Sequence, residues 1–240
     1  MKDLFIGIDL GIESKKSSAI CVLKEKNKSV FPLNEWCQKC EDLFGKKVFE
    51  KLKPYLKKTK VIAIDAPLTL GKGKGKMRLF EKFFSKDVFR KEKINPVALA
   101  LIPKVLELSL KLRKQLEKKG FVLDIDLIET SSRLLEAFLP LKNFHFQEKI
   151  EKRCQTKNQK SALFSALLAF LHSKNKTRYF GYKDGFLFLP EISLWKREWQ
   201  KKFYLVWKNR PRLKYYRLKT NIFLKKFLCY NLKNKGRKNF

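Results

Sequence analysis

Five segments of the chain carry the short apolar runs that are typical of β-strands. Turn-like residues such as Glu, Lys, Asn, Ser and Gly separate them, and two runs are apolar throughout, as expected for strands buried on both faces. The predicted strands are residues 4–9, 18–24, 29–33, 61–65 and 121–129. The first, fourth and fifth of them end on an acidic residue: Asp9, Asp65 and Glu129.

Three further segments place apolar residues at helical spacing and are predicted helices. They are residues 35–56, 96–119 and 161–172. The resulting order is β-β-β-α-β-α-β-α. It predicts an α/β fold with a mixed five-stranded sheet and helices on both faces, in which a meander of three strands precedes two strands reached by right-handed crossovers. The first, fourth and fifth strands are then parallel.

Parallel strands bring their carboxyl ends to one edge of the sheet, which is where open α/β sheets hold ligands. Ends of neighbouring strands lie about 5 Å apart, so Asp9, Asp65 and Glu129 are predicted to repel one another unless a cation lies between them. Oxygen ligands without histidine suit Mg²⁺ or Mn²⁺, and such ions activate water for phosphodiester hydrolysis. The alternative is that each acid is only a turn residue or part of a helix start.

Four runs follow one another along the chain: FIGIDLG at 5–11, IAIDAPL at 62–68, LIE at 127–129 and DGFLFLP at 184–190. In this order they resemble domain of unknown function family 429, a predicted nuclease family of the RNase H-like superfamily. The resemblance spans about residues 3–190, and IAIDAPL with the basic loop after it is its most specific part. It implies an RNase H-like fold, a divalent metal, and catalytic acids that hold the metal at Asp9, Asp65 and Glu129.

The sequence departs from that family in the last helix, where family members carry an acid and this chain has Ser165. The match after Glu129 is also partial. A hydroxyl is a poorer Mg²⁺ ligand than a carboxylate. The leading hypothesis is therefore a metal-dependent nuclease that cleaves DNA or RNA, and the second is a catalytically impaired nucleic-acid-binding protein on the same fold. A third is an actin-like or sugar-kinase-like phosphotransferase, because GIDLG also resembles the first phosphate loop of that class.

A basic, glycine-rich loop, GKGKGKMR at 71–78, follows Asp65. Lysine charges and backbone N–H groups of such a loop bind phosphates, whereas a solvated loop without a ligand is the alternative. The predicted nucleic-acid-binding residues are Lys72, Lys74, Lys76 and Arg78. Arg78 and Glu81 also resemble an Arg and acid pair that the family carries here.

The chain holds 56 Lys and Arg against 23 Asp and Glu, a net charge of +33. This charge attracts polyanions and makes DNA or RNA the predicted partner; a membrane surface and a compositional skew of a whole proteome are alternatives. Residues 192–240 carry 16 Lys and Arg against one acid, interleaved with Trp, Tyr and Phe without a clean period. We therefore predict an RNase H-like domain at 1–191 and a basic, aromatic-rich extension at 192–240, whose rings stack on bases unless the extension is simply poorly packed.

No run of about 18 apolar residues occurs in the sequence, and the first residues lack a signal-peptide pattern. We therefore expect no membrane span and a cytoplasmic location. Five cysteines, an odd number, favour reduced thiols. Cys37 and Cys40 have the CxxC spacing of a zinc site, but a second pair of ligands is not evident.

Overall fold

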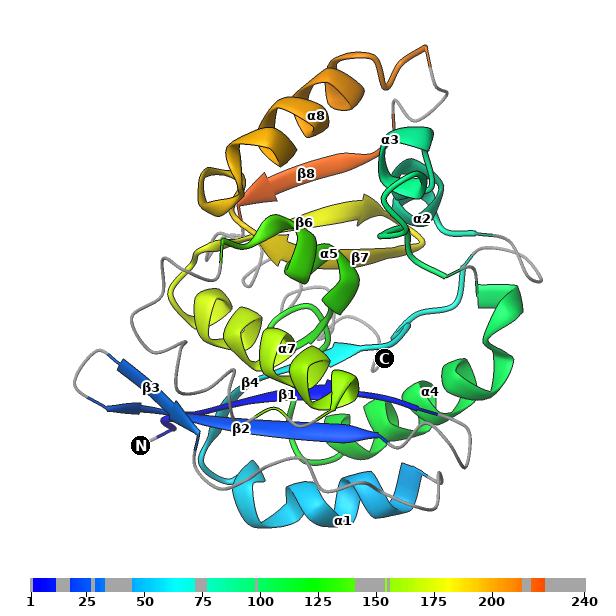
Figure 1. Ribbon diagram of the computed structural model, residues 1–240. Helices are drawn as coiled ribbons and strands as arrows, with labels where there is room; N and C mark the ends of the chain where they lie inside the picture. Colours follow the sequence, from blue (N-terminus) through cyan, green and yellow to red (C-terminus); the bar gives the residue numbers. More distant parts are fainter. Residues whose placement is uncertain are drawn as a thin grey trace, which may run out of the picture.

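The computed structural model (Figure 1) describes residues 2–11, 18–26, 29–32, 45–71, 77–97, 99–140, 154, 156–212 and 217–222. In these ranges the protein has the mixed α/β architecture that the sequence predicts. The strands are β1 Leu4–Asp9, β2 Ala19–Lys26, β3 Ser29–Pro32, β4 Thr59–Asp65, β5 Leu127–Glu129, β6 Thr177–Tyr182, β7 Gly185–Pro190 and β8 Lys219–Ile222. The α-helices are α1 Gly45–Leu56, α2 Leu79–Phe84, α3 Asp87–Arg90, α4 Pro103–Glu117, α5 Ser132–Phe138, α7 Lys157–Ser173 and α8 Arg197–Lys208, and short 3₁₀ helices are η1 Leu99–Leu101 and η3 Ile192–Leu194.

The larger sheet has the strand order β3-β2-β1-β4-β5. β1 pairs antiparallel with β2, and β2 pairs antiparallel with β3, which makes the meander. β1 and β4 are parallel, and so are β4 and β5. The predicted directions of the first, fourth and fifth strands are therefore confirmed, and their carboxyl ends lie at one edge of the sheet.

Helices cover both faces of this sheet (Figure 1): α7 lies on one face, and α1 and α4 lie on the other. Successive side chains of a strand point to opposite faces, so β1 divides its residues between two cores. Leu4, Ile6 and Ile8 pack in the cluster that includes α1 and α4, whereas Phe5 packs in the cluster that includes α7.

Gly7, in the middle of β1, allows α7 to lie directly against the strand. A Cβ atom built on Gly7 would stand 2.0 Å from the carbonyl oxygen of Ala162 and 2.1 Å from the backbone nitrogen of Ala166. Alanine on the helix and glycine on the strand thus bring two backbones together. The close packing of α7 therefore explains why the first residue of the GIDLG run is glycine.

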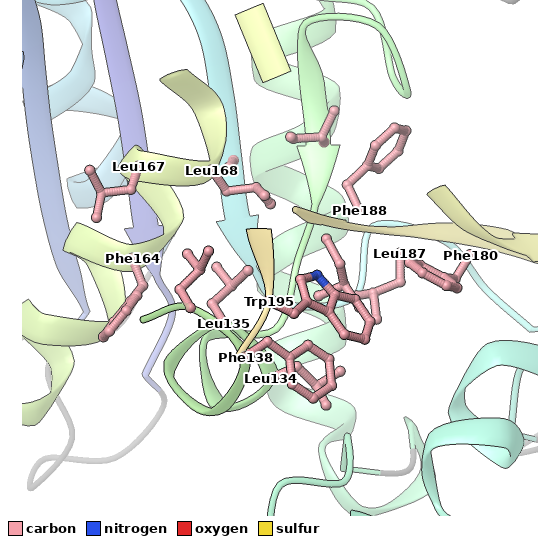
Figure 2. Close-up of a cluster of buried hydrophobic side chains, with 14 of the residues drawn as sticks. Leu134, Leu135, Phe138, Phe164, Leu167, Leu168, Phe180, Leu187, Phe188 and Trp195 are labelled. Carbon is pink, nitrogen blue, oxygen red and sulfur yellow. The ribbon is translucent and has the colours of Figure 1, made fainter. Parts of the chain in front are cut away.

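A second layer lies beyond α7 and contains the smaller sheet, with the order β7-β6-β8. Aromatic and aliphatic side chains fill the space between the two layers (Figure 2). Phe138 of α5 stacks on Trp195 with ring centroids 4.1 Å apart, and Phe180 of β6 lies 5.6 Å from Phe203 of α8. The C-terminal elements therefore share one apolar core with the helices that cover the larger sheet.

The prediction that the C-terminal aromatic residues lack a period is wrong for residues 197–208, which form the amphipathic helix α8. Trp199, Phe203 and Val206 recur at helical spacing on its buried side. With Trp199 5% exposed and Phe203 1% exposed, these rings are part of the core and do not reach nucleic-acid bases. The division at residue 191 stays a prediction about folding units, but side chains from both sides of it meet in the same cluster.

Two predicted elements are shorter than the apolar pattern suggests. The segment 96–119 is divided into η1 and α4, because Pro103 starts a new helix and disfavours helical backbone at the residue before it. The segment 121–129 is a strand only over β5, since Asp124 adopts a left-handed turn with φ 65°. The helix predicted at 35–56 is present as α1, and residues 33–44 lie outside the described part.

None of the helices within the described ranges combines the length and apolar character that a membrane crossing needs.

Gly7→Ala tests the contact between β1 and α7. The added methyl would meet backbone atoms, which cannot rotate away, so we expect the free energy of unfolding to fall by about 3 kcal/mol or more. Gly120→Ala is the control, because a Cβ atom there has no neighbour within 4 Å and only its φ of 92° is unfavourable. Urea unfolding of both variants measures the difference; equal losses would contradict the close packing.

His172 ties the end of α7 to two other elements. Its Nε2 atom lies 3.0 Å from the carbonyl oxygen of Ile125, and its Nδ1 atom lies 2.7 Å from Oγ1 of Thr177. A carbonyl only accepts, so Nε2 carries the hydrogen and Nδ1 accepts from the Thr177 hydroxyl. Burial lowers the pKa of His172 to about 4, which keeps the ring neutral in the folded protein.

The neutral His172 predicts a loss of stability in acid. In the unfolded chain His172 is protonated below its ordinary pKa of 6.5. In the folded protein its imidazole stays neutral until the pH reaches about 4. The free energy of unfolding therefore falls as the pH drops from 6.5 to about 4, by up to about 3 kcal/mol. Thermal or urea unfolding of the protein and of His172→Gln across this range checks it: the variant should have the shallower pH dependence, and parallel curves would rule the explanation out.

Candidate functional site

Asp9 and Asp65 are direct neighbours at the carboxyl ends of β1 and β4. The parallel register pairs Asp9 with Asp65, after Gly7 with Ala63 and Ile8 with Ile64. Residues paired in this way point to the same face of a sheet. The prediction that these two strand-end acids lie side by side is therefore confirmed.

Glu129 lies at the same edge but is offset by one residue. It pairs with Ile64 and not with Asp65. A shift of one residue turns a side chain to the opposite face of the sheet, so Glu129 leaves the sheet on the other face from the two aspartates, although all three acids line one cavity. In the described part of the chain, no three side chains of His, Cys, Asp or Glu are grouped so that they could hold a metal ion.

The carboxylate of Glu129 is engaged by Arg78 in a two-point ion pair. Arg78 Nη1 donates to Oε2 at 2.7 Å and Nη2 donates to Oε1 at 2.6 Å. The backbone N–H of Leu68 also donates to Oε2, at 2.7 Å. Glu129 is 3% exposed, and both of its oxygens accept hydrogen bonds within the buried network.

Arg78 forms a second ion pair with Glu81, whose Oε1 atom lies 2.6 Å from Nη2. Burial lowers the pKa of Arg78, but the charges of Glu129 and Glu81 outweigh this and the net shift is upward. Burial raises the pKa of Glu129, and the charge and hydrogen bonds of Arg78 oppose the rise. The group is thus one permanent cation shared by two carboxyl groups.

The sequence prediction for Arg78 as a nucleic-acid contact does not fit its position, because it is 2% exposed and occupied by carboxylates. Its role is to hold the chain together beside the basic loop. Arg78 Nη1 also donates to Oγ1 of Thr69 at 2.9 Å, so residues before and after the loop meet at one guanidinium. Lys72, Lys74 and Lys76 lie outside the described residues.

Asp65 is held by the start of α5. The hydroxyl of Ser132 donates to Asp65 Oδ2, and the backbone of Ser132 also hydrogen-bonds the carboxylate. Burial raises the pKa of Asp65, and the hydrogen bonds from Ser132 and the charge of Arg133 oppose the rise. Asp65 is therefore a fixed carboxylate whose charge is favoured by any additional nearby cation.

A cavity of about 290 Å³ opens above this edge of the sheet. Asp9, Asp65 and Glu129 line it from the strands, and Arg133 and Glu136 line it from α5. The remaining polar lining includes Arg78, Glu81, Thr130, Ser131, Ser132, Lys157, Asn158 and Ser161. Acidic and basic side chains thus face one space, as a site for a metal ion and an anionic substrate requires.

Ser165, where the predicted resemblance expects a helix acid, is fully buried in α7. Its hydroxyl donates to the carbonyl oxygen of Ser161 at 3.0 Å, one turn earlier in the same helix. Ser161 lines the cavity, whereas Ser165 does not. α7 therefore contributes the hydroxyl of Ser161 to the site and no carboxylate.

Sequence reasoning missed Ser132, Arg133 and Lys157. The first two had a signal: Ser131 and Ser132 lie two and three residues after the end of a predicted strand, and a helix that begins there places its first residues at the ligand-binding edge. Lys157 had none, because only the folded chain brings the first turn of α7 to this cavity. The cysteine pair at 37 and 40 lies outside the described residues, while Cys21 is buried in the core.

Comparisons with protein-family models, with curated proteins and with solved structures find no match for this chain. The resemblance to domain of unknown function family 429 therefore stays a prediction. The chemistry of the site has to be inferred from its own residues.

Arg78→Gln tests the buried ion pairs. Its loss would leave two carboxyl groups in the interior without a cation, so we expect the free energy of unfolding to fall by about 3–5 kcal/mol. The control is Lys111→Gln, which breaks an exposed pair with Glu107 at 2.6 Å and should leave the unfolding midpoint unchanged. Urea denaturation at neutral pH measures both; similar midpoints for the two variants would contradict the role given to Arg78.

Proposed function

We propose that this protein is a divalent-metal-dependent nuclease of the RNase H-like superfamily that hydrolyses phosphodiester bonds of DNA or RNA. The observation that carries the proposal is the in-register pair Asp9 and Asp65 at the carboxyl ends of two parallel strands. The strand order β3-β2-β1-β4-β5, with an antiparallel meander followed by two parallel strands, supports the superfamily assignment.

The donor set at this pair suits a hard cation. Both groups are carboxylates on adjacent strands, about 5 Å apart at the backbone, and both line the cavity. Two carboxylates at this separation favour a divalent ion with oxygen preference, Mg²⁺ or Mn²⁺. Such an ion, when bound, supplies an activated water and neutralises charge on the phosphoryl oxygens.

The protein's own residues hold and orient this pair. Ser132 fixes Asp65 by hydrogen bonds from its hydroxyl and its backbone. Glu129 and Arg78 anchor the neighbouring segment at Leu68, which follows Asp65 by three residues. The net charge of +33 draws a polyanion toward the cavity and accelerates the encounter at low salt.

A second candidate is a nucleic-acid-binding protein without catalytic activity. Two observations favour it: Glu129 is committed to Arg78, and Ser165 brings no carboxylate to the cavity. With only two acids, the ion would take most of its ligands from water and substrate. The distinction lies in cleavage, because both candidates bind nucleic acid.

Asp9→Asn and Asp65→Asn test the nuclease proposal. Each change removes one of two carboxylates from the ion, so we expect Mn²⁺-dependent cleavage of a labelled oligonucleotide to fall at least about 100-fold. Mn²⁺ binding, measured by titration calorimetry, should weaken in parallel. Thermal unfolding of each variant establishes that the fold persists.

The matched control is Asp87→Asn, which removes an exposed carboxylate on α3 that pairs with Arg90. It should leave cleavage and Mn²⁺ affinity unchanged. If the unaltered protein binds DNA and RNA but cleaves neither with Mg²⁺ or Mn²⁺, the binding candidate replaces the nuclease. Cleavage that survives both aspartate changes would show that the chemistry resides elsewhere.

A further inference from the structure

The lining of the cavity also contains two cations with no assigned role. Arg133 is the second residue of α5, and Lys157 is the first residue of α7. Both line the cavity together with Asp9 and Asp65, and both side chains are exposed. They come from segments far apart in the sequence, and the fold brings them to one space.

Apart from Asp9 and Asp65, the other charged groups of the lining are already in ion pairs. Arg78 is saturated by Glu81 and Glu129, and Glu136 pairs with Lys160 at 2.7 Å. Among the described residues, Arg133 and Lys157 form no ion pair with a carboxylate. Their charges are therefore available to an anion that enters the cavity.

An anionic substrate needs such charges. A phosphodiester that approaches Asp9 and Asp65 is repelled by both, and a bound divalent ion offsets only that pair. Arginine presents a planar fork that binds two phosphate oxygens at once, and lysine adds a point charge. The charge of Arg133 already acts on Asp65, which puts the guanidinium within electrostatic reach of the proposed metal site.

We propose that Arg133 and Lys157 form the subsite that binds a substrate phosphate beside the Asp9 and Asp65 pair. The inference rests on the proposed function, since it assigns the phosphodiester a place in the same cavity. Arg133 fixes the orientation of the phosphate, and Lys157 contacts the same phosphate from α7. Both act as binding and positioning residues, and proton transfer is not assigned to either.

The test measures binding without metal. Fluorescence anisotropy of a labelled single-stranded oligonucleotide in EDTA gives the dissociation constant over a range of salt concentrations. Arg133→Gln should weaken binding roughly tenfold and lower the salt slope by about 0.7 for the lost phosphate contact. Lys157→Gln should have a smaller effect in the same direction. Arg133→Lys should restore part of the affinity, because it keeps the charge and loses the fork.

The matched control is Arg197→Gln, which removes the same charge from an exposed position on α8 that does not line the cavity. It should change affinity clearly less than Arg133→Gln. Mn²⁺ affinity, measured separately by titration calorimetry, should stay the same or rise in Arg133→Gln, because a like charge near the ion is removed.

The outcomes separate the two proposals. Equal losses for Arg133→Gln and Arg197→Gln would remove the subsite and leave the nuclease proposal in place. A parallel loss of oligonucleotide binding, Mn²⁺ binding and thermal stability in Arg133→Gln would make Arg133 structural and also overturn the subsite. A protein that binds no oligonucleotide at all would end both proposals.

Discussion

The backbone contact between Gly7 and α7 is the constraint on which the other layers depend. It seats the helix on the central strand of the larger sheet, with Ala162 and Ala166 against the strand. The remaining faces of α7 are then left for α5, β7 and the aromatic cluster around Trp195 (Figure 2). Any residue larger than glycine at position 7 would move α7 outward, and with it the cluster that joins the two sheets.

The carboxyl edge of the larger sheet divides into a structural part and a chemical part. On one side, Glu129, Glu81 and Arg78 form a buried charged group that fixes both ends of the basic loop. On the other side, Asp9 and Asp65 form an in-register pair. Both parts line one cavity. A one-residue offset of β5 relative to β4 causes this division, since Glu129 leaves the sheet on the other face from the aspartates. Three similar acids thus have two different environments.

Local sequence was sufficient for the strands of the larger sheet and for Asp9 and Asp65, because an apolar run that closes on an acid is a contiguous pattern. It did not predict β6, β7 and β8 of the smaller sheet. It was insufficient for Glu129, whose direction depends on the register between two strands. Arg78 looked like a surface cation beside lysines, and its burial depends on an acid 51 residues away. The aromatic residues of α8 were misinterpreted although Trp199, Phe203 and Val206 do recur at helical spacing, since the Lys and Arg between them suggested a nucleic-acid surface.

Within the described residues, the larger sheet is bounded by its two shortest strands, β3 with four residues and β5 with three. β3 also ends in Pro32, which lacks a backbone donor. Short edges offer little template for pairing with a second molecule, and mutual repulsion among highly cationic chains adds to that protection. A bound polyanion neutralises the positive charge and removes this repulsion. The short edge strands are then the remaining feature that disfavours pairing between the sheets of neighbouring molecules.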